Sequence, residues 1–482
     1  MKVQVMDAIM GYGKSTYAIE HINSKPDNFY FVALPLLEEV ERYKKKCTSV
    51  ELVEPSDEET SKGEALLSIL RQRKSVVTTH HLFEEMTDSH LNAIRRLPLV
   101  RGEKVLILDE TIDLVRSVPE SKLSARDLRA DREQGFILVN EKTGKVQWNT
   151  EHDVSYNHHD KLKALCDTGQ LFFLEDRYII VEVSTEFLAC FDRILIMTYR
   201  WDSSIMAVQL GQVHGVEVEK RPLNEERVLE CYRYIADHLV IPDDYCAGDM
   251  RLSKSGLEGN EEEVAKLIRM YTDQAMKDYD IPLDLVRYTT FKEAHGFSFV
   301  DYFKSVKIGQ YQKKDSQGKV VPFSFLSHTT LGTNEHSCCK LMVYGLSKHL
   351  HPGVGAFFTA HGASISYEQW SLSSMLQWLF RGCIRDRDSG EKMVAIIPSS
   401  RMRKLAKMWL ADIKRQADQG FLDDYSGKVA SLAAQQRANK WQQFDKLIKK
   451  SPHLEGVLTF EEYIGIGGPA AKRKYKHLKQ AA

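Results

Sequence analysis

The chain has 482 residues, which is enough for about three structural units of about 150 residues each. Hydrophobic residues make up 43% of the sequence and charged residues 28%, a composition that excludes a small stapled module and wholesale disorder. The 66 Lys and Arg residues balance 67 Asp and Glu residues, so any binding site for a polyanion must be local.

Cysteine usage and hydropathy favour a cytoplasmic protein. None of the eight Cys residues forms a CxxC pair or has the spacing of metal ligands, and the sequence does not start with a signal-peptide pattern. No apolar run approaches the ~20 residues needed to span a bilayer. We therefore expect reduced thiols, no structural metal and no membrane partner.

The first 110 residues alternate between strand-like and helix-like segments. Strands are predicted at residues 3–6, 29–34, 75–79 and 105–108, and helices at 17–23, from about 36 onward and at 88–96. Such alternation is typical of βαβ units, which build a parallel sheet and bind ligands at the carboxyl ends of its strands.

Residues from about 115 to 190 interrupt this pattern. Two β-hairpins are predicted there, one formed by 136–139 and 145–148 and the other by 171–174 and 178–183. We interpret the segment as a β-rich insertion in a first lobe that spans residues 1–205. A strand at 193–197 then returns to the parallel sheet.

A second α/β lobe is predicted at residues 206–417, with a helical insertion at about 224–276 that breaks near 241–260. Its strands are expected near 323–327, 354–359 and 393–397, and its helices near 337–350, 370–386 and 401–417. Residues 418–482 are polar and helix-like and end in a basic run at 472–479. The predicted fold class is therefore α/β, with two parallel-sheet lobes and a helical C-terminal tail.

The segment AIMGYGKST, at residues 8–16, lies between a predicted strand and a predicted helix. Gly11 and Gly13 let backbone N–H groups face phosphate oxygens, Lys14 adds a point charge, and Ser15 is a ligand for Mg²⁺. The residues assigned to the nucleotide are Gly11, Tyr12, Gly13, Lys14, Ser15 and Thr16. A Gly-rich turn with a surface lysine is the alternative, since Ala8 replaces the first Gly of the general phosphate-loop pattern.

The apolar strand predicted at 105–108 ends in two acids. Asp109 is placed to hold the metal, and Glu110 to polarise the water that attacks the γ-phosphate. A helix cap or a surface acid pair is the alternative, but the nearby phosphate loop favours the catalytic interpretation.

Three polar residues recur on one side of the helix predicted at 370–386. Gln377, Arg381 and Arg385 fall within about 80° of one another on a helical wheel, opposite an apolar face. A second lobe with this arrangement can present arginine fingers to the nucleotide, each worth about 10³ to 10⁵ in rate. A solvated helix face is the alternative.

The segments AIMGYGKST, LILDET (106–111) and QWLFRGCIR (377–385) resemble motifs I, II and VI of superfamily 2 helicases. The runs FVALP (31–35), VVTTH (76–80) and LIMTYR (195–200) lie where motif Ia, the following Thr-rich motif and motif III are expected. Together they resemble the DEAD-like helicases of bacteriophages over roughly residues 1–417. The resemblance implies two RecA-like lobes, ATP and Mg²⁺ as cofactors, and translocation along nucleic acid.

The resemblance also implies roles for individual residues. Lys14, Ser15 and Thr16 would bind phosphate and Mg²⁺, and Thr198 would couple hydrolysis to strand binding. Gln377, Arg381 and Arg385 would sense the γ-phosphate. Arg385 lies eight residues after Gln377, whereas the usual family spacing is seven, so the identity of the finger stays open.

Signals for nucleic acid itself are weaker. Thr78, Thr79 and His80 follow a predicted strand and are candidates for contacts with backbone phosphates, with a satisfied loop as the alternative. The hairpin at 136–148 is a candidate duplex-splitting wedge or an ordinary sheet extension. The basic run 472–479 either holds DNA or keeps the terminus hydrated.

The sequence therefore favours an ATP-dependent helicase or translocase that acts on DNA in phage replication or recombination. It would work in the cytoplasm, that of the host cell if the protein is viral, and replication or recombination proteins are its candidate partners. The alternatives are a terminase-type DNA packaging ATPase and a nucleotide-dependent binding switch that does not separate strands.

Overall fold

The computed structural model of the chain describes residues 2–57, 61–99, 101–119, 122–151, 157–248, 250–305, 312–314, 320–322, 325–328, 336–422, 444 and 447–449. Residues Met1–Phe421 form one compact unit and Leu422–Ala482 a second one. Most of the predicted C-terminal tail, including the basic run 472–479, lies outside the described residues. Among the described helices, none is long and apolar enough to cross a membrane.

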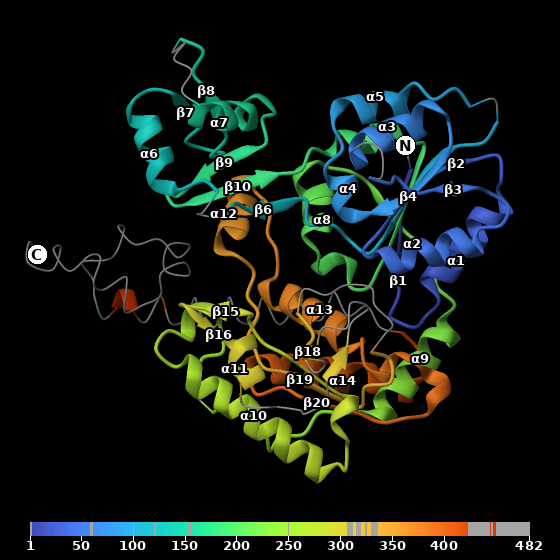
Figure 1. Cartoon of the computed structure of the whole chain (residues 1–482), viewed down its shortest axis with the longest axis vertical. Helices are drawn as coiled ribbons and strands as arrows, with labels where there is room; N and C mark the ends of the chain where they lie inside the picture. Colours follow the sequence, from blue (N-terminus) through green and yellow to red (C-terminus); the bar gives the residue numbers. More distant parts are fainter. Residues whose placement is uncertain are drawn as a thin grey trace, which may run out of the picture. The chain divides into compact units, whose positions relative to one another are not determined.

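The first lobe contains a parallel sheet with the strand order β12-β1-β11-β5-β2-β4-β3 (Figure 1). Its strands are β1 (Lys2–Asp7), β2 (Phe29–Leu34), β3 (Leu52–Val53), β4 (Ser75–Thr79), β5 (Lys104–Asp109), β11 (Arg193–Thr198) and β12 (Val218–Lys220). All six residues of β2 are buried, as expected for a central strand covered on both faces. The strands predicted near the N-terminus and at 193–197 are confirmed.

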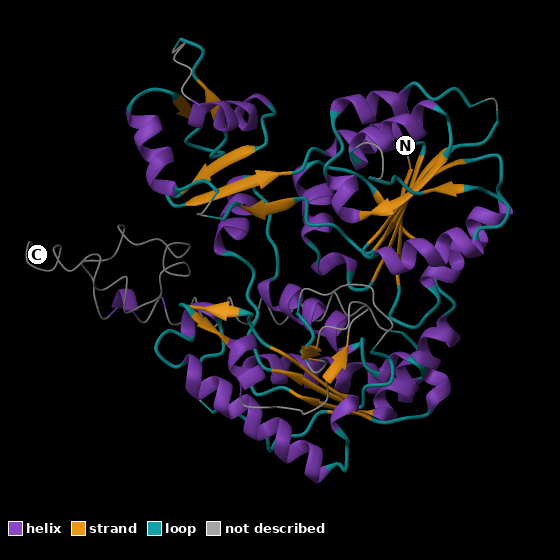
Figure 2. Cartoon of the chain, viewed as in Figure 1, coloured by secondary structure: helices purple, strands orange, loops and turns teal. Residues whose placement is uncertain are grey.

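Helices connect the strands of this sheet (Figure 2). They are α1 (Lys14–Ser24), α2 (Leu37–Lys46), α3 (Lys62–Arg71), α4 (His80–Glu84) and α5 (Asp88–Arg95), and the short helix α8 (Ile205–Val208) lies between β11 and β12. Because all the strand pairs are parallel, the residues that follow β1, β5 and β11 meet at one edge of the sheet. That edge carries the candidate site.

The first lobe extends beyond the predicted boundary at residue 205. Strand β12 pairs in parallel with β1, so residues up to Lys220 belong to the first sheet. Helix α9 (Glu225–His238) follows after four residues and packs on α14 (Ser400–Gln419) of the second lobe. The chain segment that connects the two lobes is therefore short and lies next to β1.

The insertion is an antiparallel sheet, β6-β10-β9, together with a separate hairpin, β7-β8. The strands are β6 (Val115–Ser117), β7 (Ile137–Val139), β8 (Val146–Trp148), β9 (Leu171–Leu174) and β10 (Tyr178–Glu182). Both predicted hairpins are confirmed. The insertion also contains helices α6 (Ala125–Glu133) and α7 (Asn157–Asp167), which the β-rich interpretation missed.

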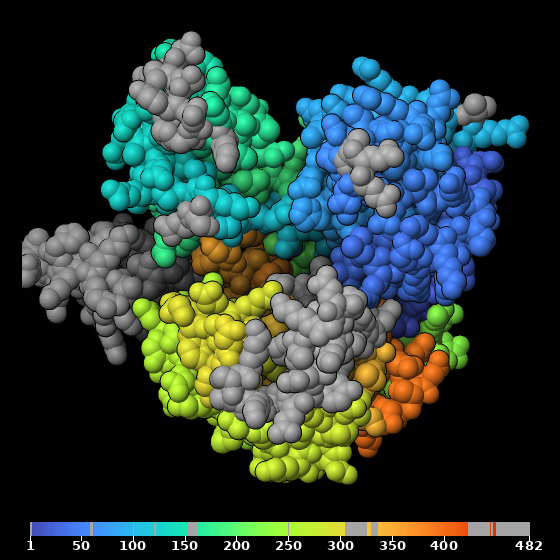
Figure 3. Space-filling model, viewed as in Figure 1, coloured from blue at the N-terminus to red at the C-terminus, as the bar shows by residue number. Residues whose placement is uncertain are grey.

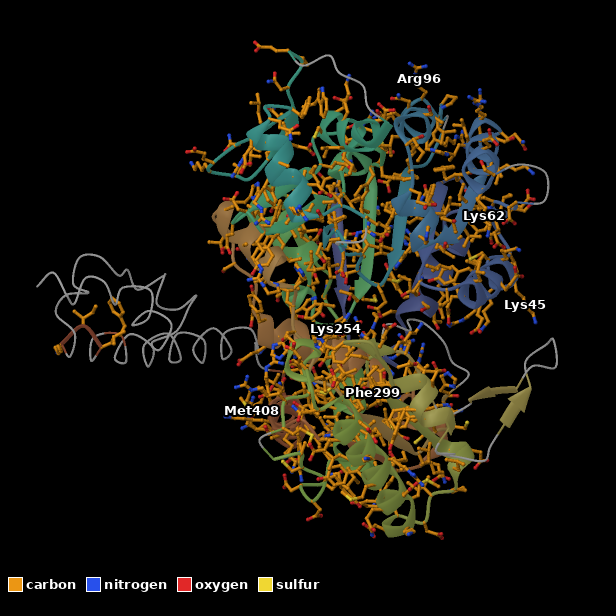
Figure 4. All side chains as sticks on the ribbon, turned by 60° about the vertical axis from the view of Figure 1, so that its left-hand side comes forward. Lys45, Lys62, Arg96, Lys254, Phe299 and Met408 are labelled. Carbon is orange, nitrogen blue, oxygen red and sulfur yellow. The ribbon has the colours of Figure 1, made fainter. Side chains whose placement is uncertain are left out.

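The second lobe has a parallel sheet with the order β13-β20-β19-β14. Its strands are β13 (Leu239–Val240), β14 (Val286–Thr289), β19 (Leu341–Tyr344) and β20 (Met393–Ile396), and helices α10 (Glu261–Asp278) and α11 (Phe299–Ser305) also belong to this lobe. Phe299 lies within the core, whereas Met408 on α14 points to solvent (Figure 4). Two parallel sheets confirm the α/β fold class with two RecA-like lobes.

Several predicted elements of the second lobe are wrong. The strand expected at 354–359 is helix α12 (Pro352–Ala360), and the helix expected at 337–350 contains strand β19. Short apolar segments that are buried on all sides show no periodicity in hydrophobicity, so a helix and a strand are easily confused there. The predicted strand at 323–327 lies partly outside the described residues, and Phe325 makes one parallel bridge to Tyr288 of β14.

Helix α12 belongs to the second lobe by sequence but packs on the insertion. It contacts β6, β9 and β10, and the ring of Phe357 meets Phe172 edge-on with centroids 4.9 Å apart. In the space-filling view the orange atoms of this region lie directly below the teal insertion (Figure 3). The insertion is therefore anchored to both lobes.

We predict that Phe357→Ala lowers the free energy of unfolding by about 3–5 kcal/mol, because it removes a fully buried aromatic ring and leaves a cavity. Chemical denaturation followed by circular dichroism measures the change. Leu138→Ala is the control, since Leu138 lies in the insertion on which Phe357 packs and is 53% exposed. Equal effects from the two variants would contradict the packing role of Phe357.

Candidate nucleotide-binding site

The loop between β1 and α1 has the backbone of a phosphate cradle. Gly11 and Gly13 adopt positive φ angles of 83° and 106°, which side-chain-bearing residues rarely adopt. Gly13 caps α1 without a side-chain hydrogen bond, so the N–H groups of the first turn are available to an anion. The helix begins at Lys14, three residues before the start predicted at residue 17.

Lys14 is held over this loop. Its Nζ donates to the carbonyl oxygen of Ala8 at 2.6 Å and lies 3.5 Å from that of Ile9, and the residue is only 8% exposed. Burial lowers the pKa of the ammonium group, while the charges of Glu110 and Asp109 act in the opposite direction. A buried cation next to free N–H groups forms a site for phosphate.

The two predicted metal ligands are in direct contact. The Ser15 hydroxyl donates to Oδ2 of Asp109 at 2.9 Å, and the Tyr43 hydroxyl lies 3.5 Å from the same oxygen. Burial, with a smaller contribution from Glu110, raises the pKa of Asp109 to about 6. A hydroxyl and a carboxylate from adjacent elements are the oxygen ligands that Mg²⁺ uses beside phosphate, so the residues fit this ion.

Glu110 joins elements from both lobes. Its carboxylate Oε2 accepts from the Thr198 hydroxyl at 3.1 Å and from Nε2 of Gln377 on α13 (Tyr367–Leu379) at 3.4 Å. Its own backbone has a φ of 76°, a strained value for this residue type that its N–H bond to Met197 helps to hold. Thr198 and Gln377, which lie far apart in the sequence, thus meet at the predicted general base.

Arg381 lies in the same cavity but not on the expected helix. Helix α13 ends at Leu379, and Arg385 belongs to a separate 3₁₀ turn. The chain leaves the helical path near Gly382. A Cβ atom at this position would lie 2.5 Å from Sδ of Met393, so the chain packs closely here instead of continuing as a helix. The prediction of one continuous helix at 370–386 is wrong, although both arginines reach the cavity.

Arg381 is poised for an anion. It is 6% exposed, and its Nε has no hydrogen-bond partner among the described residues. Burial, together with the charge of Arg385, lowers its pKa to about 10, so the guanidinium stays protonated at neutral pH. An unpartnered buried donor is costly, so the Nε of Arg381 is available to donate to an anion in this cavity.

The cavity contains both expected and unexpected residues. It is lined by Met10, Gly11, Gly13, Lys14, Ser15, Thr16, Pro35, Glu39, Arg42, Asp109, Glu110, Gln377, Phe380, Arg381 and Arg385. Sequence reasoning missed Glu39, which is 6% exposed and accepts from Arg42 at 3.0 Å. The available signal for Glu39 was its place, as an acidic residue, on the otherwise buried side of the helix predicted from about residue 36.

The residues predicted to touch nucleic acid lie at the same sheet edge but do not line this cavity. Thr78 is 3% exposed, and burial lowers the pKa of His80 to about 4, so its ring is neutral at physiological pH. Thr79 precedes α4 and is partly exposed. Among the three, Thr79 is the accessible candidate for a phosphate contact.

We predict that Asp109→Asn stabilises the protein in the absence of nucleotide. The pKa of Asp109 in the folded protein, about 6, exceeds its ordinary value of 3.8. Ionisation of this buried carboxyl therefore opposes folding, and the free energy of unfolding falls as the pH rises through this window. The variant should therefore gain up to about 3 kcal/mol relative to the wild type above about pH 6, and little near pH 4. Urea denaturation at both pH values measures the difference, and a gain that does not change with pH would refute it.

Comparison with known proteins finds similarity over part of the second lobe and over most of the chain. Residues 234–410 match the YonV C-terminal Rossmann-like domain. The SPbeta prophage-derived uncharacterized protein YonV of Bacillus subtilis (strain 168) is 28% identical over 441 residues, covering 85% of this chain and 98% of that protein.

Solved structures give more distant similarities. S. tokodaii Xpd4 has a TM-score of 0.44 and 9% identity, covering 88% of this chain and 95% of its own. The DUF1998 helicase MrfA bound to DNA has a TM-score of 0.30 and 10% identity, covering 85% of this chain and 46% of its own. A hypothetical ATP-dependent RNA helicase from Sulfolobus tokodaii has a TM-score of 0.22 and 12% identity, covering 84% and 90%.

Proposed function

We propose that this chain is an ATP- and Mg²⁺-dependent helicase or translocase that acts on a nucleic-acid strand, with DNA as the preferred substrate. One observation carries the proposal. The carboxylate of Glu110, next to the phosphate loop of the first lobe, bonds Gln377 of the second lobe, and the unpartnered Nε of Arg381 lies in the same cavity. A helicase or translocase of this kind needs side chains from both lobes around one nucleoside triphosphate.

Each part of the cavity has a chemical task toward ATP. The N–H groups that follow Gly13 and the ammonium of Lys14 bind the phosphates. Ser15 and Asp109 hold Mg²⁺, which neutralises charge on the phosphate oxygens when bound. Glu110 orients a water molecule in line with the γ-phosphate and accepts its proton as the bond to ADP breaks.

The arginines act on the charge that develops during this step. Negative charge spreads over the oxygens of the transferring phosphoryl group, and a guanidinium held at that position stabilises the transition state. Arg381 is already desolvated and is therefore effective there without further loss of water. It is the better candidate for the finger, because Arg385 is only partly buried.

Hydrolysis is coupled to strand movement through the same contacts. Thr198 and Gln377 share one oxygen of Glu110, so a change at the γ-phosphate alters a contact between the lobes. Opening and closing of the lobes then shifts a bound strand. The match to a prophage-derived protein supports a phage origin, and the role that we propose is in phage replication or recombination inside the host cell.

We predict that single-stranded DNA stimulates ATP hydrolysis by the wild-type protein and that Lys14→Ala abolishes hydrolysis without unfolding the chain. Phosphate release with and without DNA or RNA measures both effects. Nucleotide binding without strand stimulation would support a binding switch, and nuclease products from duplex DNA would support a packaging enzyme. Displacement of 3′- and 5′-tailed duplexes then tests unwinding directly.

We predict that Arg381→Ala lowers kcat by about 10³-fold but changes the affinity for ATP far less, because the charge that it stabilises develops during hydrolysis. Arg385→Ala should have the smaller effect on kcat. Lys404→Ala, an exposed position on α14, is the control. A loss confined to ATP affinity would show that Arg381 binds the ground state.

A further inference from the structure

The second lobe begins directly on the phosphate loop. Strand β12 ends at Lys220 and α9 starts at Glu225, and the N–H of Asn224 between them donates to the Tyr12 hydroxyl at 2.9 Å. Tyr12 is 8% exposed, so its ring is fixed between the two lobes. The loop that carries the glycines is therefore linked to the first turn of α9.

Arg227, in that first turn, lies against the same loop. Its guanidinium carbon is 5.1 Å from the centre of the Tyr12 ring. A Cβ atom built on Gly13 would lie 2.7 Å from Nη2 of Arg227, which places the cation beside the residue that precedes Lys14. The planar ring holds the guanidinium in position by a cation–π contact.

The position of Arg227 is not explained by an ion pair within the described residues. It is exposed, and within the described residues no carboxylate lies within ion-pair distance of its guanidinium. Nearby Arg221 differs, because it donates to Gln4 at 3.2 Å and stacks on Tyr17 at 4.9 Å. An unpaired cation held beside free N–H groups increases the positive potential of the loop.

The position of Arg227 also indicates which part of a nucleotide it meets. Arg227 does not itself line the cavity that contains Glu110 and Arg381, but it lies beside Gly13, which does line it. Gly13 precedes the start of α1, where we expect backbone N–H groups to bind the phosphates that do not react. These phosphates are common to ATP and ADP.

We propose that Arg227 is a nucleotide-contacting residue from the second lobe that binds the diphosphate shared by ATP and ADP, with Tyr12 as its positioning residue. The inference rests on the proposed nucleotide binding and adds to it. The second lobe then holds the nucleotide at two places, through Arg381 at the reacting phosphate and through Arg227 at the diphosphate. The second contact persists after hydrolysis.

Binding of ADP and of a non-hydrolysable ATP analogue, measured by isothermal titration calorimetry, tests the proposal. Arg227→Ala should weaken both ligands alike, by roughly tenfold to a hundredfold, as expected for loss of a charge-assisted hydrogen bond. Arg227→Lys keeps the charge but loses the planar group and should fall between. Arg233→Ala, an exposed arginine on the same helix, is the matched control and should bind like the wild type.

A second readout separates binding from folding. Without nucleotide, Arg227→Ala should unfold at the same temperature as the wild type, since the side chain is exposed. With ADP, its midpoint should rise less than that of the wild type, because ligand stabilisation follows affinity. Tyr12→Phe keeps the ring and should retain most of the affinity, whereas Tyr12→Ala should lose part of it.

The outcomes distinguish this proposal from the function on which it rests. If the wild type binds ADP and Arg227→Ala binds equally well, Arg227 is not a nucleotide contact, and the proposed function still stands. A loss restricted to the ATP analogue would place Arg227 at the γ-phosphate and overturn the diphosphate assignment. If the wild type binds neither ligand, the proposed function fails, and the role of Arg227 fails with it.

Discussion

The carboxylate of Glu110 is the point on which the arrangement of the site depends. Its backbone adopts a left-handed conformation at the end of β5, and one of its oxygens receives hydrogen bonds from Thr198 and Gln377. Strained residues of this kind persist only where the surrounding structure holds them. Here β11 and α13 do so from different lobes, so the geometry of Glu110, the proposed general base, depends on how the lobes meet.

The charges around Glu110 support the proposed nucleotide site. Burial raises the pKa of Asp109 and lowers those of Lys14 and Arg381, which means that all three lose hydration when the chain folds. Such desolvation is unfavourable in the empty site and favours binding of a metal ion and an anion that match the charges. Function and stability are therefore in opposition at these positions, as is common in enzymes.

The first lobe was largely predictable because its strands are apolar runs followed by recognisable signals, such as Asp109 at the end of β5 and the glycine-rich loop between β1 and Lys14. The second lobe was not, since α12 is as apolar as a strand and the break after Leu379 depends on close packing of Gly382 against Met393. Glu39 lines a cavity with residues from distant segments, and Arg227 lies beside Gly13; local sequence patterns do not encode such encounters.

The double attachment of the insertion has a mechanical consequence. Its chain enters and leaves the first lobe at Leu114 and Val183, which are hydrogen-bonded neighbours, while α12 fixes its sheet to the second lobe. Buried aromatic contacts are closely packed and do not deform continuously. Any rearrangement of the lobes must therefore either carry the insertion along or break the packing of Phe172 on Phe357.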